Sequence, residues 1–91
     1  KVVDLTLEAP HVERELALVK VTGKGNHRVE ALRIADIFRA RVVDSTNSSF
    51  VFEIVGKTGK INAFVELMEP LGLKDVSRTG VVAIARGASA L

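Results

Sequence analysis

Hydrophobic residues recur along the chain with a helical spacing in two segments. Apolar side chains at positions i, i+3, i+4 and i+7 lie on one face of a helix. The first set is Ala31, Ile34, Ala35 and Phe38, and the second is Ile61, Phe64, Val65 and Met68. We therefore predict a helix over His27–Arg39, with Asn26 as its N-cap. We predict a second helix from Thr58–Gly59 to the stop signals Pro70 and Gly72.

Shorter apolar runs between and around these helices predict strands. The runs are His11–Thr22, Arg41–Ser45, Phe50–Val55 and Val76–Arg86. Within the first run, Leu16–Val19 is apolar on both faces, as expected where both sides of a sheet are covered. The polar segment Thr46–Ser49 is typical of a hairpin loop. A further run, Lys1–Leu7, predicts a short leading strand that ends before Pro10, which would interrupt a ladder.

The predicted element order specifies a fold class. After the leading strand the order is βαββαβ, the split βαβ or ferredoxin-like arrangement of the α+β class. Its four-stranded antiparallel sheet carries two helices on one face and leaves the other face open.

Composition indicates that this open face is a contact surface. The 91 residues make one domain that buries roughly 64% of its unfolded surface. Yet 47% of the residues are hydrophobic and only four are aromatic, all Phe. A chain this short and this aliphatic exposes apolar surface, which usually marks a partner.

The same composition excludes several classes. Without Cys there is neither a disulfide framework nor a thiolate zinc site. No apolar run approaches the length of a transmembrane helix. The 13 Lys and Arg residues are balanced by 11 Asp and Glu along the chain, so strong binding to nucleic-acid phosphates is not expected.

Two polar clusters can be considered as binding sites, one for a metal ion and one for a phosphate group, and both fit a structural role better. His11, Glu13 and Glu15 share one face of a strand and could bind a metal, but an exposed polar strand end fits them better. The segment Gly56–Lys60 resembles a phosphate-binding loop. It fails the pattern because Ile61 replaces the required Ser or Thr, so a capped turn with solvated lysines is the better interpretation.

Two binding alternatives also follow from the topology. Phe50 and Phe52 share a strand face, as do the stacking aromatics of an RRM-like RNA-binding domain. The first strand has no aromatic and the basic-Gly pair of the RNP1 motif is missing, so we predict core or interface phenylalanines. The loop Gly23–Asn26 offers backbone N–H groups, which leaves open a stand-alone ACT-like module that binds an amino acid.

Four ordered blocks carry a family resemblance. They are His11–Val21, Ile37–Asp44, Gly56–Phe64 and Arg78–Gly87. Together they resemble the C-terminal domain of the small, regulatory subunit of acetohydroxyacid synthase (acetolactate synthase), the enzyme that opens branched-chain amino-acid biosynthesis. The resemblance implies that residues 1–10 are the end of a preceding ACT domain and its linker. Residues 11–91 would form the C-terminal domain.

The resemblance also implies a function. It predicts a non-catalytic domain that assembles with itself and with the catalytic subunit, activates the enzyme and takes part in feedback regulation. Thiamine diphosphate, magnesium and FAD would be held by the catalytic subunit, so no catalytic, cofactor or metal residue is expected in this chain. A branched-chain amino-acid effector would bind mainly through the ACT domain. The protein would be cytoplasmic in a bacterium and in an organelle in a eukaryote, with no nucleic-acid or membrane partner.

On this basis we expect an interface formed by exposed polar residues of these blocks. The candidates are His11, Glu13, Arg14, Arg78, Thr79 and Arg86. Arginine is a frequent interface anchor because its planar guanidinium makes several directed hydrogen bonds.

Overall fold

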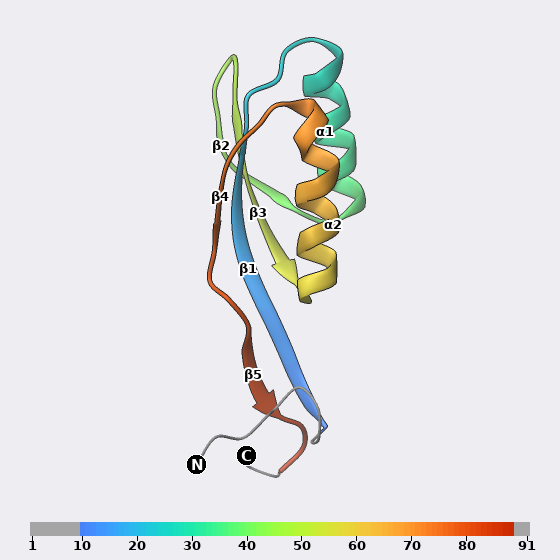
Figure 1. The fold of residues 1–91 in the computed structure, drawn as a ribbon, viewed down its shortest axis with the longest axis vertical. Helices are drawn as coiled ribbons and strands as arrows, with labels where there is room; N and C mark the ends of the chain where they lie inside the picture. The colour runs from blue at the N-terminus through green and yellow to red at the C-terminus, as the bar shows by residue number, and fades with distance from the viewer. Residues whose placement is uncertain (1–9, 89–91) are drawn as a thin grey trace.

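Residues 10–88, which the computed structural model describes, fold into a five-stranded antiparallel sheet with two α-helices on one side of it (Figure 1). The strands are β1 (His11–Val21), β2 (Arg41–Ser45), β3 (Phe50–Gly56), β4 (Leu73–Arg78) and β5 (Val82–Ala85). The helices are α1 (Asn26–Ile37), α2 (Thr58–Met68) and the short 3-10 helix η1 (Glu69–Leu71). The predicted leading strand Lys1–Leu7 lies outside the described residues.

The strand order identifies the fold. The sheet runs β2-β3-β1-β4, and β5 pairs with the outer end of β1. Two βαβ units interlock in this order, with β1 and β3 in the centre. The predicted ferredoxin-like α+β fold is confirmed.

The core lies between the helices and the sheet. Its buried residues are Ala17, Val19, Val21, Ala31, Ile34, Ala35, Phe50, Phe52, Ile54, Ile61, Phe64, Met68 and Leu71. The ring of Phe52 meets that of Phe64 edge-on, with centroids 5.9 Å apart, a favourable geometry for aromatic pairs. Both predicted helix stripes face this core, and Phe38 and Val65 complete them as partly buried residues.

The phenylalanines face the helices and leave the open face without a ring. Phe50 and Phe52 are buried on the helix side of β3. They therefore form core, as predicted, and provide no platform on which a base could stack. The geometry that an RRM-like RNA-binding domain needs is absent from the described residues.

Two predicted boundaries are wrong. The N-cap of α1 is Gly25, with φ of 58°, and Asn26 is the first helical residue. Glycine adopts this left-handed backbone at little cost, so the turn into the helix uses Gly25. The helix also ends two residues earlier than predicted, at Ile37, and Arg39 has a positive φ of 57°.

The last predicted strand, Val76–Arg86, is in fact two strands. It starts earlier, at Leu73, and is interrupted between Arg78 and Val82. Ala17 pairs with Arg78, whereas Arg14 pairs with Val82. Between these two pairs, two residues of β1 (15 and 16) lie opposite three residues of the partner segment (79–81), so one extra residue is inserted, as in a β-bulge.

This insertion changes which face the last strand presents. Side chains alternate along a strand, so a shift of one residue moves each of them to the opposite face. Arg78 shares the helix side of the sheet with Ala17, but Val82 and Ile84 share the open side with Arg14 and Val12. We call residues 11–14 of β1 together with β5 the arm, and the remaining sheet with its helices the body. In Figure 1 the arm extends past the lower ends of the helices.

Candidate functional site

An ion pair fixes the junction between the arm and the body. Arg78 Nε donates to Glu15 Oε2 at 2.8 Å, and Arg78 Nη2 donates to Glu15 Oε1 at 2.7 Å. The third nitrogen, Nη1, donates to Asn62 Oδ1 at 2.7 Å. The Glu15 side chain is 5% exposed and that of Arg78 is 30% exposed. The guanidinium thus joins β1, β4 and α2 at one point.

The same contact sets the protonation of Glu15. The hydrogen bonds from Arg78 hold the pKa of the Glu15 carboxyl below its ordinary value, although burial acts in the opposite direction. The charge of Arg78 and hydrogen bonds from Thr58 and the Gly80 backbone lower this pKa further. The pair is therefore ionised at neutral pH.

Thr79 closes the gap between β4 and β5. Its N–H donates to the Leu16 carbonyl at 3.0 Å, and its Oγ1 accepts from the Leu16 N–H at 3.1 Å. The hydroxyl also donates to the Gly80 carbonyl at 2.8 Å. Two of the six predicted interface residues, Arg78 and Thr79, therefore make contacts within the chain that hold the arm in place.

On the helix side of the arm, β1 carries polar side chains, opposite Ala83 and Ala85 of β5. His11 and Glu13 lie there, with His11 Nε2 3.3 Å from Glu13 Oε2. Glu15 follows on the same face but is turned to Arg78, so the three residues considered for a metal do not converge. Among the described residues no group of three or more His, Cys, Asp or Glu side chains is placed to hold a metal ion. Arg86 is exposed at the end of β5, and its N–H donates to the Pro10 carbonyl at 3.2 Å.

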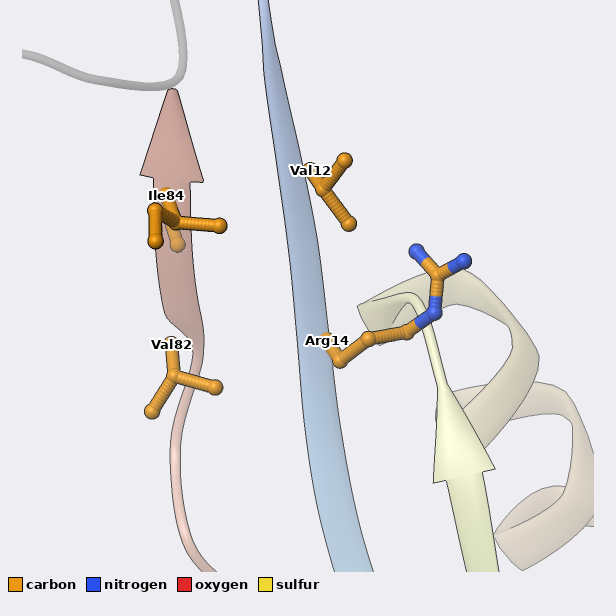
Figure 2. Close-up of a pocket in the computed structure, with 5 residues that line it drawn as sticks. Val12, Arg14, Val82 and Ile84 are labelled. Carbon is orange, nitrogen blue, oxygen red and sulfur yellow. The ribbon is translucent and has the colours of Figure 1, made fainter. Parts of the chain in front are cut away.

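The open side of the arm is an apolar groove. It is lined by Val12, Arg14, Val82, Ala83 and Ile84. Val12 is 42% exposed, Val82 66% and Ile84 70%. Figure 2 shows these side chains on the two paired strands. The sequence reasoning missed this surface because an unbroken last strand would have turned Val82 and Ile84 to the other side.

A cationic hollow adjoins the groove. It is lined by Arg14, Val55, Gly56, Lys57 and Lys60. Arg14 belongs to both surfaces, and its side chain extends from β1 towards the end of β3 (Figure 2). Lys60 Nζ donates to the Val55 carbonyl at 3.0 Å. The sequence indicated the two lysines, but only the pairing of β1 with β3 brings Arg14 beside them.

The glycines before α1 serve the chain's own turn. A Cβ at Gly23 would lie 2.7 Å from the Leu71 carbonyl oxygen, so the backbone approaches η1 too closely for a larger residue. The N–H groups of His27 and Val29 donate to the carbonyls of Lys24 and Gly25. Amino-acid binding at this loop stays a prediction.

None of the helices within residues 10–88 has the length and apolar character needed to cross a membrane.

Comparison with known proteins finds relatives that match most of this chain. A family model described as the small subunit of acetolactate synthase matches residues 14–87. The chain is 52% identical over 87 residues to the acetolactate synthase small subunit of Aquifex aeolicus, covering 94% of this chain and 45% of that protein. It is 45% identical over 87 residues to the Bacillus subtilis acetolactate synthase small subunit, covering 96% and 50%.

A solved structure agrees with these matches. The crystal structure of the acetolactate synthase small subunit from Thermotoga maritima superposes with a TM-score of 0.81 at 32% identity. The superposition covers 88% of this chain and 49% of that chain. This chain therefore spans about half the length of the relatives that it matches.

Proposed function

The chain belongs to the family of acetolactate synthase small subunits, and on this premise we propose that it is a non-catalytic assembly domain. It binds another copy of the small subunit and the catalytic subunit of acetolactate synthase. Through these contacts it raises the activity of the catalytic subunit and takes part in feedback regulation of branched-chain amino-acid biosynthesis.

The observation that carries this proposal is the apolar surface left exposed on the open side of the sheet. Val12, Val82 and Ile84 on the arm are joined by Leu18 and Val55 on the body. Exposed apolar surface that is contiguous marks sites of protein association. The arm is also a two-stranded ribbon, which is marginal in water unless its apolar side packs against something.

The proposal divides the work of the enzyme between chains. Thiamine diphosphate, magnesium and FAD are assigned to the catalytic subunit. A branched-chain amino acid, such as valine, is assigned mainly to an ACT domain. The present domain then contributes contacts, and its interface includes the predicted residues His11, Glu13, Arg14 and Arg86. Arg78 and Thr79 support it from within.

The test uses the complete small subunit with its catalytic subunit. We expect no acetolactate formation by the small subunit alone, and a faster rate when it is added to the catalytic subunit. Sedimentation should show self-association of the small subunit and a larger complex after mixing. Turnover by the small subunit alone would overturn the proposal, as would an unchanged rate together with the absence of a complex.

A further inference from the structure

We propose that the apolar groove of the arm and the adjoining cationic hollow form one docking site for an acidic, partly apolar segment of the catalytic subunit. This inference rests on the proposed function and specifies which surface makes the contact and what chemistry its partner must have. In this site Arg14, Lys57 and Lys60 supply positive charge. Val12, Val82 and Ile84 supply the apolar contact.

The first argument is the charge of the hollow. Arg14 comes from β1, Lys57 precedes α2 and Lys60 lies in its first turn, so the fold gathers three cations from two separate parts of the chain. Within residues 10–88 none of the three has a carboxylate within 4.0 Å, whereas Arg33, Arg41 and Arg78 each do. The first turn of α2 contains no acidic residue. The hollow therefore presents uncompensated positive charge to a partner.

The second argument is the continuity of charge with apolar surface. Arg14 lines both the apolar groove and the cationic hollow, so the two are parts of one surface. Interfaces combine an apolar centre with charged groups at its rim. Arginine suits the boundary because its stem packs on apolar neighbours while its guanidinium meets a carboxylate.

These features favour an acidic segment over the other occupants. A phosphate ion would engage the cations but leave Val82 and Ile84 exposed. A second copy joined through this same surface by a two-fold axis would bring like charges together, since each side of such a contact uses the same residues. An acidic segment with apolar side chains pairs its carboxylates with the cations of the hollow and covers the apolar residues of the groove.

The experiment measures the affinity of the complete small subunit for the catalytic subunit over a range of salt concentrations. The variant Arg14→Glu/Lys57→Glu reverses two charges of the hollow. Its matched control, Lys24→Glu/Lys74→Glu, makes the same charge change at exposed positions. Lys24 follows β1 and Lys74 lies in β4 beside the Val21 end of β1, away from Arg14. We expect Kd to rise about tenfold or more for the first variant at low salt, with a smaller effect at high salt. The control should bind as the wild type does.

A second variant tests the apolar half of the site. Val82→Ser/Ile84→Ser should raise Kd about tenfold at low and high salt alike, because apolar contact is not screened by ions. Circular dichroism and thermal unfolding establish that each variant is folded. If Arg14→Glu/Lys57→Glu does not fold, Arg14→Gln/Lys57→Gln replaces it.

The possible outcomes separate the inference from the proposed function. Weaker binding by both site variants, with an unchanged control, supports the docking site. Wild-type affinity in the folded site variants overturns it and leaves the proposed function standing, because the complex still forms. If the wild-type small subunit itself neither binds nor activates the catalytic subunit, both fail. If inorganic phosphate binds the wild type but not Arg14→Glu/Lys57→Glu, while subunit affinity is unchanged, the hollow is a small-anion site and the inference is wrong.

Discussion

The body and the arm share β1 but distribute their apolar side chains in opposite ways. In the body, the helix side of β1 is apolar and buried through Ala17, Val19 and Val21. In the arm, the helix side of β1 carries His11 and Glu13, and the large apolar residues Val12, Val82 and Ile84 lie on the open side. The two patterns meet at the inserted residue between β4 and β5, beside the Glu15–Arg78 pair.

This difference shows what each region is stabilised by. The helix side of the body is buried within the chain, whereas Leu18 and Val55 stay exposed on its open side. The apolar side of the arm has no cover among the described residues, because α1 and α2 lie on the other side of the sheet (Figure 1). Substitutions should therefore affect folding in the body and association in the arm. Four predictions test that division.

The largest effect is expected at the centre of the body. Phe52 is fully buried between Phe50 and Phe64, so Phe52→Ala removes a ring and leaves a cavity. We expect a loss of about 3–5 kcal/mol in the free energy of unfolding. For a domain of 91 residues the whole free energy of unfolding is only about 5–14 kcal/mol. Urea unfolding measures the change.

The matched substitution in the arm is Val82→Ala. Because Val82 is exposed in the isolated chain, we expect it to lower the free energy of unfolding by less than about 0.5 kcal/mol. Equal losses for Phe52→Ala and Val82→Ala would show that the arm packs as firmly as the body, and the division would be wrong.

A pair of glycines provides the second comparison. Gly72 in the body has φ of 104°, and Gly80 at the junction has φ of 78°. Alanine in this left-handed region costs about 1–2 kcal/mol at either position. At Gly72 the new Cβ would also lie 2.5 Å from the Thr22 carbonyl oxygen, whereas at Gly80 nothing lies within 4 Å.

Thermal unfolding of the two alanine variants should separate these contributions. We expect Gly72→Ala to lower Tm by clearly more than Gly80→Ala does, because only Gly72 adds a steric clash to the backbone cost. The reverse order would mean that the junction is packed more tightly than the body.

The buried side of the body could be predicted from the sequence, whereas the face that the last strand presents in the arm could not, for a physical reason. Helical spacing identified Ile61, Phe64 and Met68 because one apolar stripe implies one buried face. The arm depends on a single inserted residue near Gly80, and strand alternation alone does not reveal where an insertion falls. The role of Arg78 was also hidden, since its partner Glu15 lies 63 residues away in the chain.

The third prediction concerns pH and the junction. Because Arg78 lowers the pKa of Glu15 in the folded chain, the ionised carboxylate stabilises the fold at neutral pH. This stabilisation is lost as pH falls below about 4.3, the ordinary value for Glu, and through the lower folded value. Glu15→Gln should therefore lower the urea midpoint at pH 7, and the difference from wild type should shrink as the medium becomes acidic.

A double-mutant cycle checks that the pair is responsible. If Arg78→Gln already removes the interaction, then adding Glu15→Gln should change the midpoint by less than Glu15→Gln does alone. Additive losses would mean that the two side chains act independently. We expect a smaller effect than at Phe52, since water still reaches the Arg78 side chain.

The smallest effect on folding is expected at Ile84, the most exposed of the large apolar residues of the groove. Ile84→Ser should change the free energy of unfolding of the chain by less than about 0.5 kcal/mol. In the complete small subunit it should weaken binding to the catalytic subunit, because the apolar contact is made only in the complex. Ile61→Ser, at a buried position of α2, is the opposite control, since it should destabilise the fold strongly. If Ile84→Ser instead unfolds the chain, the arm belongs to the core, and its exposed apolar side is not a surface kept for a partner.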